Sequence, residues 1–145
     1  MSAGRFTLLA CALIGAMQAA DSQKTLYERL GGQPAIQAVA NGLVDKILAD
    51  GRVNQWFVHA SSSPAATASY KANLAAFLCQ STQGPCNYTG LNMSEAHKGR
   101  GVTSEAFDAV VQDLVSVLDN LKVPAKEKSD VLGLLAPLKT VIVQK

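Results

Sequence analysis

The most informative residue in the chain is a histidine that precedes a glycine-rich turn. The sequence holds only two histidines. His97 stands in the segment Ala96-His97-Lys98-Gly99-Arg100-Gly101-Val102, a short distance after Met93. A neutral imidazole among apolar neighbours is a common metal ligand, and one such group can serve as the axial ligand of a haem iron. We therefore identify His97 as the candidate iron ligand, with its second ring nitrogen bonded to a backbone carbonyl.

A haem site also needs an apolar slot for the porphyrin and cations near its two propionates. Lys71, Lys98 and Arg100 are the candidate propionate partners. Apolar side chains at helical spacing are the candidate slot: Phe57, Leu74, Phe77, Leu78, Met93, Val102, Phe107, Val110 and Leu135. Each pattern has an ordinary interpretation as a capping histidine, solvated cations or plain core, and spacing alone does not demonstrate haem.

Length and composition predict one exported domain. The chain has 145 residues, 48% of them hydrophobic, and a formal charge of +2 without a basic cluster, which argues against a nucleic-acid partner. Residues 1–20 resemble a signal peptide, with Arg5 before an apolar run too short to span a membrane. We therefore expect a mature domain from 21 to 145, located in the periplasm and without a membrane span.

Two cysteines remain after such a leader is removed. Cys79 and Cys86 flank an expected helix end and turn, so a disulfide is the economical interpretation in an exported protein. Two reduced thiols in a cytosolic protein are the alternative. A zinc site is disfavoured because no further cysteine or paired histidine completes four ligands.

The apolar spacing predicts helices only. A helical turn or two is expected around Leu26, Tyr27 and Leu30, and a loop is expected over 58–69. The longer helices are expected at 35–48, 70–80, 103–121 and 124–143, with a short one at 93–97. In the helix at 124–143, Pro137 should kink or locally break the helix. The side chains expected to face inward there are Val131, Leu134, Leu135, Leu138, Val141 and Ile142.

The order of these pieces resembles the group 1 truncated globins, from Leu26 to about Val143. The resemblance is carried by these segments: Leu26-Tyr27-Glu28-Arg29-Leu30-Gly31-Gly32, Ile47-Leu48-Ala49-Asp50, Trp56-Phe57, Tyr88-Thr89-Gly90, Ala96-His97-Lys98-Gly99-Arg100-Gly101-Val102 and Ala136-Pro137-Leu138. It implies an all-α fold, the two-over-two helical sandwich. It also implies that His97 is the proximal ligand and that Phe57 is wedged against the porphyrin.

The distal side departs from the family pattern. Val44 stands where many members have a tyrosine that hydrogen-bonds bound oxygen, and Leu74 stands where a glutamine is common. Tyr70, one turn before Leu74, either donates a hydrogen bond to a bound gas, approaches the iron, or simply packs. His59 is a less favoured sixth ligand.

The resemblance implies a protein that binds haem b and, on it, oxygen, nitric oxide or carbon monoxide. Oxygen binding and transport, gas sensing, or oxidation of nitric oxide to nitrate with an external reductase are the expected roles. Two alternatives stay open: a haem electron carrier or peroxidase, and a haem-free helical interaction domain.

Overall fold

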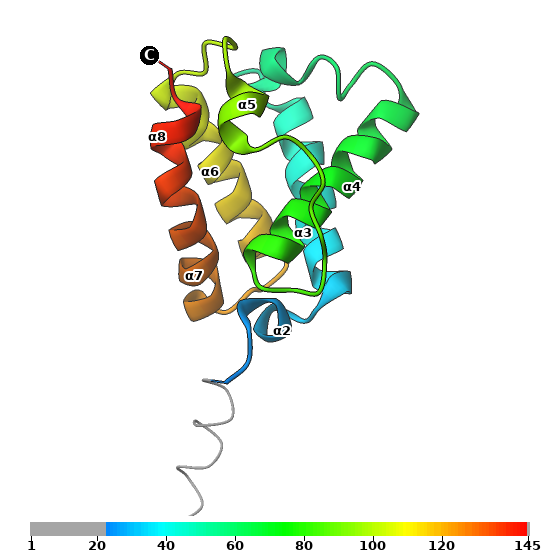
Figure 1. Cartoon of the computed structure of the whole chain (residues 1–145), viewed down its shortest axis with the longest axis vertical. Helices are drawn as coiled ribbons and strands as arrows, with labels where there is room; N and C mark the ends of the chain where they lie inside the picture. Colours follow the sequence, from blue (N-terminus) through cyan, green and yellow to red (C-terminus); the bar gives the residue numbers. More distant parts are fainter. Residues whose placement is uncertain (1–22, 145) are drawn as a thin grey trace, which may run out of the picture.

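The computed structural model describes residues 23–144, so the expected signal peptide at 1–20 lies outside the described residues. Every regular element in the described part is helical (Figure 1). The elements are α2 (Leu26–Leu30), α3 (Gln33–Ala49), the 3-10 turn η1 (Asn54–Phe57), α4 (Pro64–Ser81), α5 (Met93–His97), α6 (Ser104–Asn120), α7 (Ala125–Leu135), η2 (Ala136–Leu138) and α8 (Lys139–Ile142). The expected all-α architecture is confirmed.

The chain reverses sharply between α2 and α3. Thr25 caps α2 by accepting from the backbone N–H of Glu28, whose carboxylate in turn accepts from the N–H of Thr25. Gly31 ends α2 at φ 111°, and Gly32 follows at φ 73°. Both values lie in the left-handed region, where glycine has no steric penalty, so the pair lets α3 start in a new direction.

Helix α4 is longer than its apolar pattern indicates. It begins at Pro64, so the prediction of a loop over 58–69 is wrong for its second half. Ser63 is extended and its side chain accepts from the N–H of Ala66, while Pro64 occupies the first turn, where its missing N–H costs nothing. The first turns of α4 are mostly exposed and carry small residues, so they lack the hydrophobic signal on which the prediction depended.

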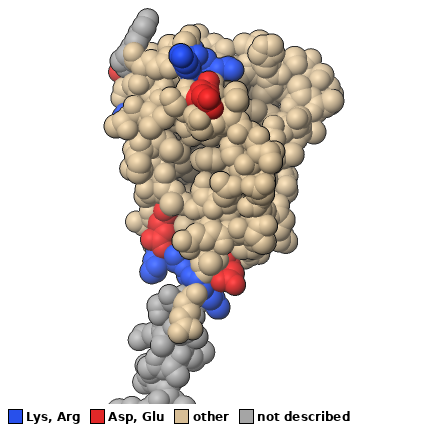
Figure 2. Space-filling model, viewed as in Figure 1, with Lys and Arg blue, Asp and Glu red and all other residues tan. Residues whose placement is uncertain are grey.

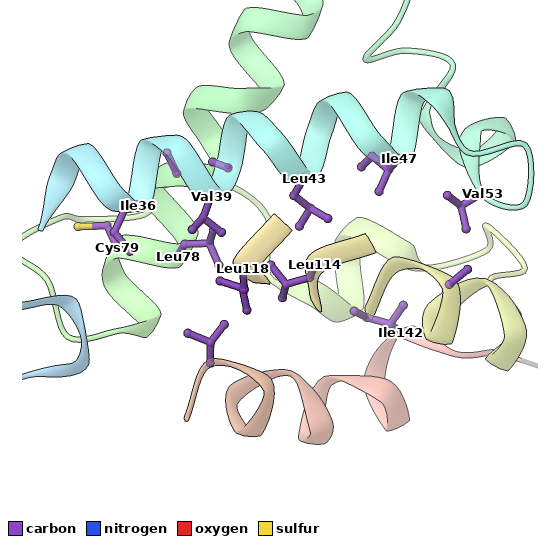
Figure 3. Close-up of a cluster of buried hydrophobic side chains, with 14 of the residues drawn as sticks. Ile36, Val39, Leu43, Ile47, Val53, Leu78, Cys79, Leu114, Leu118 and Ile142 are labelled. Carbon is purple, nitrogen blue, oxygen red and sulfur yellow. The ribbon is translucent and has the colours of Figure 1, made fainter. Parts of the chain in front are cut away.

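Helix α3 runs through the centre of the fold and packs against α4 on one side and α6 on the other. Figure 1 shows α6 beside the α7–α8 arm, and α3 crossing α4. Figure 3 shows a row of apolar side chains on α3 that faces residues from α6 and α8. The core includes Ile36, Val39, Leu43, Ile47, Val53, Leu78, Cys79, Leu114, Leu118 and Ile142.

The C-terminal helix is interrupted at Pro137, as the sequence predicted. Helix α7 ends at Leu135, and η2 separates it from the single turn of α8. Val131 and Ile142 are buried as expected, but Leu134 and Val141 are exposed, which corrects the prediction that they face inward. Leu134 instead lines a shallow pocket beside Leu26 and Arg29 of α2, and the tighter 3-10 turn changes the register between α7 and α8.

No helix within residues 23–144 is long and apolar enough to cross a membrane.

Candidate functional site

Helix α5 presents His97 in a defined tautomer. The side chain of Asn92 caps this short helix by accepting from the N–H of Glu95 at 2.9 Å. At its last position, Nδ1 of His97 lies 2.8 Å from the carbonyl oxygen of Met93. A carbonyl can only accept, so in the neutral ring Nδ1 carries the proton and Nε2 keeps a free lone pair. The half-buried imidazole therefore has the form that a metal ligand requires.

The segment after His97 is irregular and held from a distance. Gly99 and Gly101 adopt φ 73° and 63°, which agrees with the predicted glycine-dependent turn. Between them, the carbonyl of Arg100 accepts a 3.0 Å hydrogen bond from Nε1 of Trp56. The sequence placed Trp56 in the family motif but gave no signal for this bond, which joins η1 to the loop that follows the candidate ligand.

The apolar side chains that we assign to the porphyrin slot are incompletely covered by the rest of the fold. Leu78 and Val102 belong to the buried core. The others are half-buried and packed against that core: Phe57, Tyr70, Leu74, Phe77, Met93, Phe107, Val110 and Leu135. Figure 2 shows a hollow in the face of the molecule on which α5 lies. The charged residues, drawn blue and red, lie toward the two ends of the molecule in this view. Apolar side chains left partly open are what a planar apolar group would cover.

Tyr70 and Phe57 meet near the expected distal side. Their rings are edge to face, with centroids 5.7 Å apart. Burial and, to a smaller extent, the negative charge of ionised Tyr88 raise the pKa of Tyr70 to about 12, against the opposing effect of Arg100. The structure therefore brings together an aromatic ring from η1 and one from α4. Within the described residues, the Tyr70 hydroxyl has no hydrogen-bond partner among the protein groups.

Tyr88 packs against one of the slot residues, Phe77, a contact that the sequence did not indicate. Its ring packs edge to face on Phe77 with centroids 5.5 Å apart, and its hydroxyl donates to the carbonyl of Leu91 at 2.9 Å. Its backbone N–H donates to the side chain of Gln80. Tyr88 thus ties the loop before α5 to α4.

The remaining distal candidates differ in exposure. Val44 is fully buried at 0% exposure within α3, whereas Leu74 is half-buried at the edge of the core. His59 is exposed in the turn after η1, where its carbonyl accepts from Ser62. The structure therefore gathers Tyr70 and Leu74 with the slot residues and leaves His59 on the surface.

The three candidate propionate partners differ in whether their charge already has a partner. Lys71 forms an ion pair with Asp45 on α3, with Nζ 2.6 Å from the carboxylate, so its charge already has a partner. Lys98 and Arg100 are exposed and lie directly after His97. These two cations are the ones next to the candidate ligand.

The donor set fits a haem iron better than a free metal ion. Within residues 23–144 there is no group of three or more His, Cys, Asp or Glu side chains that could hold a metal. A protein-chelated zinc or transition-metal ion requires several such ligands, but a haem iron already has four porphyrin nitrogens and needs one axial imidazole. The single tautomer-fixed His97 and the apolar side chains around it agree with that requirement.

The two cysteines lie together at the end of α4. Their sulfur atoms are within bonding distance, and their Cα atoms are 5.8 Å apart. Cys79 is fully buried, and Cys86 begins the segment that leads to Tyr88 and α5.

Comparison with known proteins identifies relatives of the whole domain. The family model for bacterial-like globins matches residues 25–144. The group 1 truncated haemoglobin of Mycolicibacterium paratuberculosis is 31% identical over 79% of this chain and 80% of its own length. That of Tetrahymena thermophila is 37% identical over 70% and 79%.

Solved structures give the same assignment. The Fe(III) form of truncated haemoglobin from Tetrahymena pyriformis is 30% identical and superposes with a TM-score of 0.74 over 84% of this chain and 100% of its own. The 2/2 haemoglobin from Synechococcus sp. PCC 7002 reaches 0.74 at 27% identity, over 84% and 100%. The fold is therefore the two-over-two globin fold, and the chain belongs to the bacterial-like globins and, among them, to the group 1 truncated haemoglobins.

Proposed function

We propose that this globin holds one haem b through Nε2 of His97 and binds a diatomic gas on the opposite side of the iron. Membership of the globin family supports haem and gas binding in general. The observation that carries the specific assignment is the 2.8 Å contact between Nδ1 of His97 and the Met93 carbonyl. It leaves Nε2 unprotonated and fixes the ring relative to α5.

The surrounding residues have separate roles in this proposal. Phe57 and the other slot residues exclude water and support the porphyrin. Lys98 and Arg100 neutralise the propionates from the proximal side. Tyr70 keeps its proton at neutral pH because its pKa is about 12, so its phenol is a hydrogen-bond donor to the gas and not a phenolate ligand.

When bound, haem would supply an iron that takes up oxygen, nitric oxide or carbon monoxide reversibly. With oxygen and nitric oxide together, its chemistry yields nitrate and ferric iron, which needs one electron to return to the ferrous state. Oxygen binding and nitric oxide detoxification are therefore both proposed uses of this site. Detoxification requires an external reductase to supply the electron, and oxygen binding does not.

We further propose that the protein works in the periplasm with a disulfide between Cys79 and Cys86. The leader-like residues 1–20 and the short distance between the two sulfur atoms support this proposal. Mass spectrometry of the protein from a periplasmic extract would test it. A chain that starts near Asp21 and is two hydrogen masses lighter than the reduced form is expected, whereas the intact chain in the cytosolic fraction would contradict export.

The ligand assignment is tested by optical spectra of the ferric, ferrous and carbon monoxide forms of the chain from Asp21 onward. The parent protein should show a Soret band that shifts with carbon monoxide. His97→Ala should weaken or abolish it, and the matched control His59→Ala, which changes an exposed histidine, should leave it intact. Equal loss in both variants, or a band unaffected by His97→Ala, would contradict ligation by His97.

Nitric oxide detoxification is tested separately. The ferrous oxygenated protein is mixed with one equivalent of nitric oxide, and nitrate and the ferric spectrum are measured together. Stoichiometric nitrate supports detoxification, and repeated turnover then requires added reductant. Nitric oxide that displaces oxygen without nitrate would leave oxygen binding as the function.

A further inference from the structure

The loop after His97 has one backbone hydrogen bond to α5, from the N–H of Arg100 to the carbonyl of His97 at 3.1 Å. Helix α5 has five residues, and the two glycines that follow it at positions 99 and 101 have nothing within 4 Å of where a Cβ would stand. Such a segment has access to many backbone conformations. The position of α5 must therefore be determined by contacts from other elements.

Gln144, near the C-terminal end of the chain, makes one hydrogen bond to the end of α5 and two to the loop that follows it. The side-chain Nε2 of Gln144 donates to the carbonyl of His97 at 2.7 Å, and its Oε1 accepts from the N–H of Gly101 at 3.2 Å. The backbone N–H of Gln144 donates to the carbonyl of Val102 at 3.0 Å. A single primary amide thus uses its donor at one end of the loop and its acceptor near the other.

The end of α8 brings Gln144 to this position. Helix α8 packs against α5, and its Ile142 is buried. Val143 then leaves the helix in an extended conformation at φ −75° and ψ 128°, which carries the next residue along the loop. Figure 1 shows the C-terminal end of α8 beside α5.

We propose that Gln144 is a positioning residue for the iron ligand, acting on the backbone of His97 through its side-chain amide. This inference rests on the proposed ligation by His97. The bond from Nδ1 to Met93 fixes the imidazole relative to α5, and the amide of Gln144 fixes the end of α5 relative to the rest of the fold. Together they determine how the ring meets the iron.

Three variants separate this role from general stability. Gln144→Ala removes both side-chain bonds, and Gln144→Glu keeps an acceptor for Gly101 but loses the donor to His97. Thr140→Ala is the matched control, since its hydroxyl bonds only within the C-terminal arm, to the carbonyl of Pro137. The measurements are the iron–histidine stretching band of the ferrous protein, the rate of haem loss to an acceptor in excess, and the hydrogen exchange of the Gly101 amide in the haem-free protein.

Gln144→Ala should shift the iron–histidine band, speed haem loss by about fivefold and expose the Gly101 amide to exchange, because two net hydrogen bonds are lost from an exposed site. Gln144→Glu should shift the band in the same direction while Gly101 stays protected. Thr140→Ala should match the parent.

An unchanged band in both Gln144 variants, in a parent whose spectrum depends on His97, would overturn the positioning role while the proposed function stands. Lower thermal stability with an unchanged band would do the same, because it would show a structural role only. A parent spectrum that does not depend on His97 would instead overturn the ligation on which the inference rests.

Discussion

The ring of Phe57 meets the ring of Tyr70 edge to face, with centroids 5.7 Å apart and planes inclined by 73°. This contact joins η1 to α4 and holds the phenol of Tyr70 among the side chains of the proposed haem slot. Within the described residues the hydroxyl lacks a protein partner, so it is available to a bound gas. If Val44 and Leu74 stand at the family's usual distal tyrosine and glutamine positions, as the resemblance implies, Tyr70 is the remaining distal donor in our proposal.

Tyr70→Phe should therefore speed oxygen dissociation by about tenfold and change carbon monoxide dissociation much less. One hydrogen bond of about 1.4 kcal/mol corresponds to that factor, and the carbon monoxide complex is less polar. Because burial raises the pKa of the Tyr70 phenol to about 12, the donor keeps its proton and the oxygen dissociation rate of the parent should stay flat between about pH 6 and 10. Stopped-flow or flash-photolysis kinetics measure both quantities.

Tyr88→Phe is the matched control for that experiment. Its hydroxyl bonds to the carbonyl of Leu91, so its removal should leave the oxygen dissociation rate within about twofold of the parent. Equal rates in the parent and Tyr70→Phe would rule out Tyr70 as the distal donor.

A second prediction concerns the buried carboxyl of Asp113. It lies beside Asp50 and 4.0 Å from the guanidinium of Arg52, which bonds to Asp50 at 2.7 Å. Its buried Oδ2 has no hydrogen-bond partner among the described residues. Burial and the charge of Asp50 raise the pKa of Asp113, against the opposing effect of Lys46 and Arg52. Its carboxyl therefore holds its proton more tightly in the folded chain than in the unfolded chain.

A raised carboxyl pKa makes folding stability fall as pH rises from the ordinary value of about 4 through the raised one. Asp113→Asn should remove that part of the pH dependence, because a neutral amide neither ionises nor repels Asp50. We expect the variant to be more stable than the parent by about 1 kcal/mol at pH 7, with a smaller difference at pH 4. Urea unfolding at both values measures it, and an identical difference at both would contradict the assignment.

The contribution of Asp50 to folding stability depends on pH in the opposite direction. The guanidinium of Arg52 lowers the pKa of Asp50 to about 2, so this group contributes stability that is present above about pH 4 and is lost as pH falls toward 2. The comparison between parent and Asp113→Asn separates the two effects.

The sequence predicted the parts of the fold that depend on strong local signals. The apolar stripes of α3 and α6 gave both helices to within two residues, and Pro137 marked the break in the C-terminal arm. The start of α4 was missed because its first turns carry small, exposed residues, so the capping of Ser63 and Pro64 was the only signal there. Leu134 was misplaced because a spacing pattern cannot show that α7 lies at an edge of the fold beside α2.

In the candidate site, too, the features that depend on neighbouring residues were predictable, and those that depend on helix packing were not. The bond of His97 to a backbone carbonyl was predictable because His97, Met93 and the end of α5 are neighbours in the sequence. The bond from Trp56 to the carbonyl of Arg100, the ring contact of Phe57 with Tyr70, and the ion pair of Lys71 with Asp45 join residues from different elements. Such contacts depend on helix packing, for which one sequence gives no local signal.

The buried core provides a third prediction. Leu118 on α6 is 0% exposed, and Leu121, one turn further along, is 43% exposed. Leu118→Ala should lower the free energy of unfolding by about 3 kcal/mol, because it removes buried methyl groups and leaves a cavity against α3. The matched control Leu121→Ala should change it by about 0.5 kcal/mol or less. Urea unfolding with haem in equal excess measures both, and similar losses in the two variants would contradict the described packing.

The last prediction concerns the proposed disulfide between Cys79 and Cys86, whose sulfur atoms lie within bonding distance. Closing this short loop should stabilise the fold by about 2.5 kcal/mol on the chain-entropy model. Reduction of the chain from Asp21 onward should therefore lower the urea midpoint. The Cys79→Ala/Cys86→Ala double variant should resemble the reduced parent and should not respond to the reductant. Because Cys86 starts the segment that leads through Tyr88 to α5, reduction should also speed haem loss. If the reductant changes neither the urea midpoint nor the rate of haem loss of the parent, the two thiols are not joined.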